Sequence, residues 1–107
     1  MQTFFIYVTT KDKAEAREIG RHLVQSRLAA CVNIFEHMNS MYIWQDEFQD
    51  DQEAVLIAKT TEQRMPELIE AIKSRHSYEV PCIVSLPIHD GNPDFLQWIA
   101  GQVGLVK

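Results

Sequence analysis

The sequence is poor in cysteine and glycine, and each shortage removes a class of fold or site. Two cysteines, Cys31 and Cys82, are too few for a disulfide scaffold in a chain of 107 residues. With only four glycines, a backbone cradle for phosphate is hard to build, and no glycine-rich nucleotide motif occurs. No apolar run approaches the roughly 20 residues of a membrane span, and we expect no signal peptide. The sequence therefore predicts a cytoplasmic protein without a membrane span.

Positive charge is also scarce. The chain has 15 Asp and Glu against 10 Lys and Arg, a formal net charge of −5. Nucleic acid is therefore not expected as the main partner, because phosphate contacts need clustered Lys and Arg. The length fits a single domain over residues 1–107, and the 46% hydrophobic content supports one modest core.

The longest strand-forming stretch runs from Leu28 to Thr61 and predicts a long β-hairpin. Its apolar and β-branched runs are bounded by polar residues, which is the usual signal for strands. We expect a bulge at 36–40 and the turn in the acidic segment 46–53. A strand rises about 3.3 Å per residue and a helix about 1.5 Å. The arms therefore outreach the flanking helices, and we expect them to pair with other copies of the chain.

The other elements complete a βαββαβ order with an extra C-terminal helix. Asp12 and Asn92 are the expected N-caps of the first and last helices, and Gly20 is expected to allow close packing of the first helix on a sheet. This order predicts an α+β, ferredoxin-like fold with strand order 4-1-3-2. The two cysteines then lie at opposite sheet edges, too far apart for a disulfide. Strand patterns occur at 4–9 and 82–86, and helical patterns at 12–24, 65–72 and 92–103.

The possible metal ligands are scattered along the chain. None of the four histidines and two cysteines forms a C-x-x-C, H-x-x-x-H or H-E-x-x-H pattern. Cys31 and Cys82 are more simply interpreted as small core residues on strands. The acidic segment 46–53 lacks the calcium-loop pattern and is interpreted as a solvated hairpin tip. One chain alone therefore predicts no dedicated metal site.

The densest polar group is Arg75-His76-Ser77-Tyr78-Glu79, between the second helix and the last strand. A loop that combines a base, a phenol, an acid and a cation often lines a cleft. Lys59 would add a second cation if it faced the same way. The alternative is a helix C-terminus at which Arg75 and His76 complement the helix dipole. A weaker candidate is a small-anion site at Thr9-Thr10-Lys11, before the first helix.

Six short segments keep a fixed order and spacing along nearly the whole chain. They are Val8-Thr9-Thr10, Leu28 to Ile34, Tyr42-x-Trp44, Lys59-Thr60-Thr61, His76-x-Tyr78-Glu79-Val80-Pro81, and Gly91-Asn92-Pro93 with Phe95-Leu96-x-Trp98. Together these segments resemble the CutA family, the divalent-ion tolerance proteins.

The resemblance implies a tight homotrimer, similar to the PII signalling proteins, in which long hairpins pair with neighbouring subunits. Clefts between subunits are then the ligand sites, and Lys59, His76, Tyr78 and Glu79 match positions near them. A divalent metal such as copper is the implied ligand. Of the family's metal positions this chain keeps His76, and Cys82 is a candidate substitute.

The sequence also departs from the family pattern. The family usually has Pro, Gly, Pro and Glu where this chain has Lys11, Asp46, Ser77 and Cys82. In some metal-binding members a Cys ends the first strand and a His pair precedes the tyrosine loop, whereas this chain has Val8 and Arg75-His76 there. A lone His is a poor site for a soft metal unless another subunit adds ligands.

Three functions follow as alternatives. The first is a non-enzymatic trimer that binds a divalent metal or a small anion in its clefts. The second is a structural or interaction trimer. The third is a small hydrolase or phosphatase of the same fold, which is disfavoured because no G-x-S-x-G motif and no triad spacing occur. We therefore expect a binding protein and not an enzyme.

Overall fold

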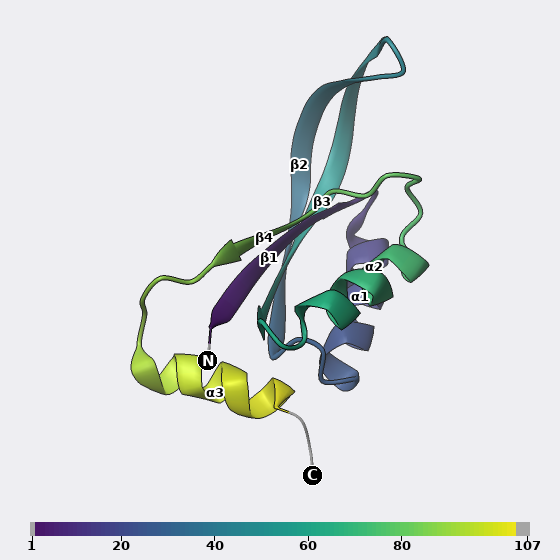
Figure 1. Ribbon diagram of the computed structural model, residues 1–107. Helices are drawn as coiled ribbons and strands as arrows, with labels where there is room; N and C mark the ends of the chain where they lie inside the picture. The colour runs from purple at the N-terminus through teal and green to yellow at the C-terminus, as the bar shows by residue number, and fades with distance from the viewer. Residues whose placement is uncertain (1, 105–107) are drawn as a thin grey trace.

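A computed structural model describes residues 2–104 and shows four strands and three helices (Figure 1). The elements in chain order are β1 (Thr3–Thr10), α1 (Lys13–Gln25), β2 (Cys31–Trp44), β3 (Glu47–Thr61), α2 (Met65–Arg75), β4 (Ile83–Pro87) and α3 (Pro93–Val103). No helix within residues 2–104 is long and apolar enough to cross a membrane.

The strands form one antiparallel sheet in the order β2-β3-β1-β4, which agrees with the order expected from the sequence. Pro87 closes β4 at one edge of the sheet. Cys31 begins β2 at one edge, and Cys82 directly precedes β4 at the other. Both thiols are free, as expected from this separation.

The core lies between the sheet and helices α1 and α2, which cover one face (Figure 1). Side chains alternate across a strand, so every second residue of β1 and β3 enters this core. Gly20 of α1 is where the helix comes closest to the sheet. A Cβ on Gly20 would lie 2.9 Å from Val32 Cγ2 and 3.0 Å from Leu56 Cδ1, which confirms the expected close packing. The fully buried core residues include Ile6, Val8, Ile19, Leu23, Leu56, Leu68 and Ile72.

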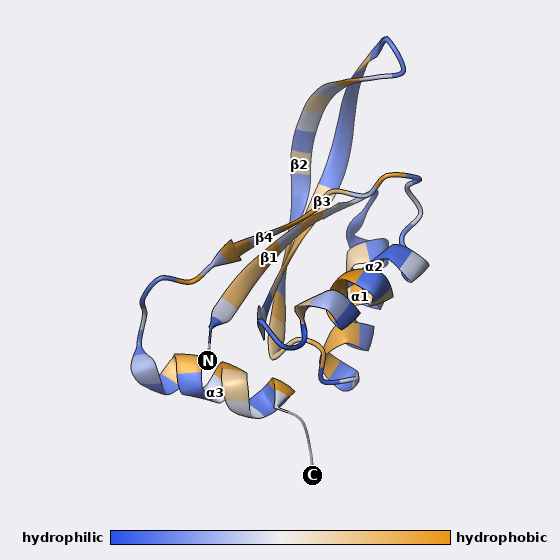
Figure 2. Cartoon of the chain, viewed as in Figure 1, coloured by the Kyte–Doolittle hydropathy of each residue, from blue (hydrophilic) through white to orange (hydrophobic). Residues whose placement is uncertain are grey.

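The long hairpin extends beyond the rest of the sheet. β2 and β3 pair from Cys31↔Lys59 to Trp44↔Glu47, whereas β1 pairs with β3 only over residues 54–61. Residues 47–53 and the opposite part of β2 therefore project past the helices (Figure 1). Figure 2 shows β3 as hydrophilic along this projecting part and more hydrophobic where it crosses the sheet.

The hairpin turn is shorter than predicted. It consists of Gln45 and Asp46, whose φ angles of 51° and 66° are those of a two-residue turn with left-handed backbone at both positions. The prediction of a turn over 46–53 was wrong, because most of these acidic residues lie in β3. The expected bulge is confirmed by a register shift between Phe35 and Met38 and by a φ of 62° at His37.

Two of the helices begin where local capping chemistry predicts. Asp12 Oδ1 accepts a hydrogen bond from Glu15 N at 2.9 Å, and Glu15 Oε1 accepts one from Lys11 N at 3.0 Å. Asn92 Oδ1 accepts from Asp94 N at 3.1 Å, with Pro93 as the first residue of α3. These side chains satisfy amide groups that have no partner inside a helix.

The sheet face opposite α1 and α2 retains exposed apolar side chains. Phe35 of β2 is 57% exposed, and Val84 and Leu86 of β4 are about half exposed. Pairing of Phe5 with Leu86 and of Tyr7 with Val84 places the β4 side chains on the face away from the core. α3 packs near one end of the sheet, where Ile99 and Val103 are buried with Ala30.

Candidate functional site

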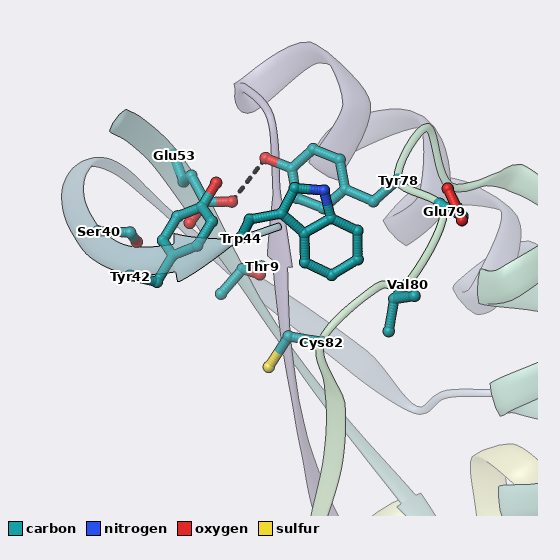
Figure 3. Close-up of a pocket in the computed structure, with 9 residues that line it drawn as sticks. All are labelled: Thr9, Ser40, Tyr42, Trp44, Glu53, Tyr78, Glu79, Val80 and Cys82. Atoms are coloured by element: carbon teal, nitrogen blue, oxygen red, sulfur yellow. Dashed lines mark hydrogen bonds between the residues drawn. The ribbon is translucent and has the colours of Figure 1, made fainter. Parts of the chain in front are cut away.

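A pocket of about 410 Å³ lies where the loop after α2 meets the projecting hairpin (Figure 3). Aromatic rings and carboxylates dominate its wall, together with two aliphatic hydroxyl groups and one thiol. The lining residues are Thr9, Ser40, Tyr42, Trp44, Glu53, Tyr78, Glu79, Val80 and Cys82.

Strand geometry explains how residues so distant in sequence line one pocket. Ser40, Tyr42 and Trp44 alternate along β2, so they share one face of the hairpin. Their face includes Glu53, because Met38 pairs with Glu53 in the β2-β3 register. The loop after α2 closes the other side with Tyr78, Glu79, Val80 and Cys82 (Figure 3).

The strongest polar contact in the pocket joins Tyr78 to Glu53. The Tyr78 hydroxyl donates to Glu53 Oε2 at 2.6 Å (Figure 3), and Glu53 is only 7% exposed. Burial and the neighbouring Glu53 carboxylate raise the pKa of Tyr78 far above its ordinary value of 10.0. Tyr78 is therefore a neutral donor at any physiological pH, and it fixes the orientation of a buried negative charge.

A second tyrosine makes a similar bond in a more open setting. The Tyr42 hydroxyl donates to Asp51 Oδ2 at 2.9 Å, and both residues are exposed. This hydrogen bond is the main cause that raises the pKa of Tyr42. Both tyrosines thus donate a hydrogen bond to a carboxylate, but the carboxylate of Glu53 is buried and that of Asp51 is exposed.

His76 holds the loop that carries Tyr78. Its Nε2 lies 2.7 Å from the Thr9 carbonyl oxygen, which can only accept, so Nε2 donates. Its Nδ1 accepts from Tyr78 N at 3.1 Å, and the His76 and Tyr78 rings lie 4.8 Å apart. Both ring nitrogens are thus engaged by the backbone, and His76 acts here as an anchor of the pocket wall.

Glu15 provides a second anchor for the same loop. Its Oε2 accepts from Ser77 N at 2.8 Å, while Oε1 accepts from Lys11 N. Burial by itself raises the pKa of Glu15, but the hydrogen bonds from Lys11 and Ser77 outweigh it and lower the pKa below its ordinary 4.5. This carboxylate occupies the amide that an anion at Thr9-Thr10-Lys11 would need, so the structure does not favour the small-anion site there.

Lys59 lies away from the pocket. It pairs with Phe5 of β1, whereas Thr9 pairs with Val55, four residues along β3. Four residues of a strand span about 13 Å. The Lys59 amino group donates to the side chain of Asn33 on β2. Of the four predicted cleft residues, the structure brings Tyr78 and Glu79 into the pocket, places His76 behind it and leaves Lys59 outside.

Cys82 is exposed and lines the pocket, so its interpretation as a core residue was wrong. It precedes β4 and is not part of the strand. Glu53, Glu79 and Cys82 share the pocket, yet residues 2–104 contain no group of three His, Cys, Asp or Glu side chains close enough to hold a metal ion. The donor groups of these described residues therefore do not complete a metal site by themselves.

Sequence reasoning missed much of the pocket wall. Thr9, Ser40 and Glu53 were not proposed as cleft residues, and Tyr42 and Trp44 entered only as parts of a family motif. The alternation of Ser40, Tyr42 and Trp44 was visible as a strand pattern. What was missing was the register that sets this face opposite Tyr78.

Comparison with known proteins gives a consistent result. The family described as "CutA1 divalent ion tolerance protein" matches residues 4–102. The divalent-cation tolerance protein CutA of Thermus thermophilus is 44% identical over 99 residues, covering 92% of this chain and 96% of the relative. Protein CutA of Mus musculus is 39% identical over 87% of this chain, which spans about half (52%) of the mouse protein.

Solved structures agree with the sequence matches. The divalent cation tolerance protein of Thermus thermophilus superimposes with a TM-score of 0.92 at 43% identity, covering 95% of this chain and 99% of that one. The structure titled periplasmic divalent cation tolerance protein CutA, from Archaeoglobus fulgidus, gives 0.91 at 38% identity, with 94% and 98% covered. The chain belongs to the CutA1 divalent ion tolerance family.

Proposed function

We propose that this chain is a non-enzymatic binding protein that takes up a divalent cation, such as copper, in ligand clefts of a homotrimer. Membership of the family and the names of its relatives support the cation. The observation that carries the proposal is the charge of the pocket. Its described lining holds the carboxylates of Glu53 and Glu79, three aromatic rings, and no Lys, Arg or His. Carboxylates and ring faces both attract positive charge.

The donor set suggests how the trimer would complete the site. Glu53 and Glu79 supply oxygen, which hard divalent cations prefer, and the Cys82 thiol suits a softer ion such as copper. Because one chain does not bring three such groups together within residues 2–104, we propose that a neighbouring subunit supplies further ligands. Tyr78 and Glu79 form the wall of the cleft, and His76 holds that wall in place.

The hairpin and the open sheet face support the homotrimer. Residues 47–53 of β3 have no β1 partner, and β2 and β4 are free edges in the described chain. Such edges tend to pair with other chains. Phe35, Val84 and Leu86 add exposed apolar area, which typically marks an interface. In this assembly the subunits would keep the ferredoxin-like arrangement expected from the sequence.

Calorimetric titration with Cu²⁺ and Zn²⁺ tests the proposed function. The parent chain should give stoichiometric heat, and Glu79→Gln should weaken binding because it removes a negative charge from the pocket. Cys82→Ser should weaken binding of both ions, since both Cu and Zn bind thiolates. The matched control is Glu62→Gln, an exposed acid outside the pocket, which should bind like the parent. Absence of saturable heat with both ions would reject the cation proposal.

The open apolar face also favours a second candidate, a structural or interaction trimer without a ligand. On that view the Tyr78–Glu53 bond stabilises the hairpin and the pocket stays solvated. Stable trimers that show no heat with either metal would support this candidate. Turnover of an acyl phosphate would instead revive the hydrolase alternative.

The proposal includes a cytoplasmic location. It is supported by the low cysteine content, two in 107 residues, because disulfide-rich frameworks are typical of secreted chains. The Archaeoglobus relative carries a periplasmic title and a rice relative a chloroplastic name, so cell fractionation of the native host is the direct test.

A further inference from the structure

A groove on the helical layer gathers basic side chains in an otherwise acidic molecule. It lies along α1 and the end of α2, away from the pocket and from the open sheet face, and encloses about 620 Å³. Three of the chain's five arginines line it, although the formal net charge of the chain is −5. The lining residues are Ala14, Arg17, Glu18, Arg21, His22, Gln25 and Arg75.

The arginines of the groove have no carboxylate partner within the described part of the chain. Arg17, Arg21 and Arg75 make no salt bridge there, although Glu18 lies on the same helix face. By contrast, Arg64 is paired with Glu67, and Arg27 donates to Gln102. The arginines without a carbonyl, amide or carboxylate acceptor are therefore concentrated in this one groove.

The geometry of the groove is partly fixed in advance. Arg17 and Arg21 are four residues apart on α1, so they project from the same side of the helix. Arg75 reaches across from α2, and its Nη2 lies 3.1 Å from His22 Nδ1. Because a guanidinium only donates, His22 accepts this bond and holds Arg75 over α1. Such preorganisation lowers the entropy cost of binding a ligand.

The side chains define the chemistry of the ligand. A guanidinium presents a planar fork of donors that matches phosphate oxygens in pairs, and three such forks suit a compound with more than one phosphate. Apart from His22 the lining has no aromatic ring, so the groove offers little surface for stacking a nucleobase. The phosphate chain itself, and not a base, would therefore be the recognised part.

We propose that the groove formed by Arg17, Arg21, His22 and Arg75 binds a small polyphosphate-bearing anion. The site is separate from the cation pocket, so a trimer could respond to two ligands of opposite charge. Its position on the helical layer leaves it accessible when the open sheet face is covered by other subunits.

Calorimetry with inorganic tripolyphosphate at low salt tests this proposal on the whole chain. The parent should show saturable binding that weakens with added NaCl, as expected for a charged ligand. Arg21→Gln should raise the dissociation constant by about tenfold or more. This is the usual loss of affinity when a hydrogen bond to a charged group is removed. Arg75→Lys keeps the charge but loses the fork, and should fall between the parent and Arg21→Gln.

Two controls make the outcome decisive. Lys73→Gln removes one positive charge from α2 outside the groove, where Lys73 pairs with Glu70, and should change binding by less than about twofold. Equal weakening by Lys73→Gln and Arg21→Gln would overturn the site, since it would mean diffuse attraction only. Lack of any saturable heat with the parent would overturn it as well. Glu79→Gln should leave tripolyphosphate binding unchanged, which separates this result from the test of the cation pocket.

Discussion

Tyr78 and Tyr42 each donate a hydroxyl hydrogen bond to a carboxylate, but their surroundings differ. Glu53, the partner of Tyr78, is 7% exposed, whereas Asp51, the partner of Tyr42, is exposed. A buried charge that loses its donor costs more than an exposed one, because water does not fully replace the bond. The two residues form a natural matched pair for measuring what the pocket contributes to stability.

We predict that Tyr78→Phe lowers the free energy of unfolding by about 1–2 kcal/mol. Tyr42→Phe should change it by less than about 0.5 kcal/mol, as is usual at exposed sites. Urea unfolding of the two variants at one fixed protein concentration gives the comparison. Equal effects of the two substitutions would show that burial of Glu53 does not increase the contribution of the Tyr78 hydrogen bond to the free energy of unfolding.

Glu15 predicts a pH dependence of stability. Its pKa is lower in the folded chain than its ordinary 4.5, so the unfolded state binds the proton more readily. The stabilisation by Glu15 is therefore fully present above pH 4.5 and is lost as the pH falls through the lower folded value. The advantage of the parent over Glu15→Gln should be present at neutral pH and should shrink as the pH falls below 4.5.

Thermal unfolding across this pH range checks the Glu15 prediction. Glu18→Gln is the control, because Glu18 lies one turn away on the same helix and makes no side-chain hydrogen bond within residues 2–104. The difference between Glu18→Gln and the parent should stay small throughout. A parent-to-Glu15→Gln difference that did not depend on pH would contradict the assigned hydrogen bonds to Lys11 and Ser77.

At this scale, some of the predicted cleft residues line the pocket of one chain and others do not, for physical reasons. Tyr78 and Glu79 could be found, because a mixed polar loop next to an edge strand commonly lines a cleft. Lys59 lies outside this pocket, because strand alternation gives the face of the sheet but not the distance along it. His76 lies behind the pocket, and its contacts there depend on tertiary structure, because the Thr9 carbonyl and the Tyr78 amide occupy both of its ring nitrogens.

Two glycines in helices have opposite surroundings, and they allow a test of packing between elements. Gly20 of α1 faces Val32 and Leu56, and an added Cβ would lie within 3.0 Å of both side chains. Gly101 of α3 has nothing within 4 Å of an added Cβ. The same substitution to Ala should therefore have opposite signs at the two positions.

We predict that Gly20→Ala destabilises the chain by about 1–3 kcal/mol, because overpacking outweighs the gain in helix propensity. Gly101→Ala should stabilise it by about 0.5–1 kcal/mol, since only the propensity changes. Differential scanning calorimetry of both variants provides the measurement. A stabilised Gly20→Ala variant would mean that the helix moves away from the sheet without loss of packing.

The first residues of helices α1 and α3 could be predicted, because side-chain capping determines them, whereas the position of the hairpin turn could not. Asp12 and Asn92 cap their helices because a short side chain with an oxygen satisfies a nearby amide, which requires no tertiary information. The hairpin turn was assigned to the acidic segment 46–53 because charged residues usually mark exposed loops. Exposed strands tolerate charge equally well, and the turn falls at Gln45 and Asp46, neither of which is the glycine that such a turn favours.

The open sheet face allows a test of the proposed assembly of the whole molecule. We predict a mass of three chains by light scattering at micromolar concentration. Val84→Lys should reduce this mass to that of a single chain, because a lysine charge in a covered apolar face is not solvated. Val24→Lys is the matched control, since Val24 is exposed on the helical layer at 37%, and it should leave the mass unchanged. A folded parent with the mass of one chain would reject the trimer.

The two-residue turn at Gln45 and Asp46 also has a consequence for the order in which the chain folds. β2 and β3 meet across two residues, whereas β1 finds β4 across nearly the entire chain, with Phe4 opposite Pro87. Closing a short loop loses less entropy than closing a long one, so local pairs form sooner. Strands β2 and β3 should therefore pair first, and β4 should pair with β1 last. Because Val84 and Leu86 reach their places only with β4, the subunits of the proposed trimer would recognise one another only after each has finished folding.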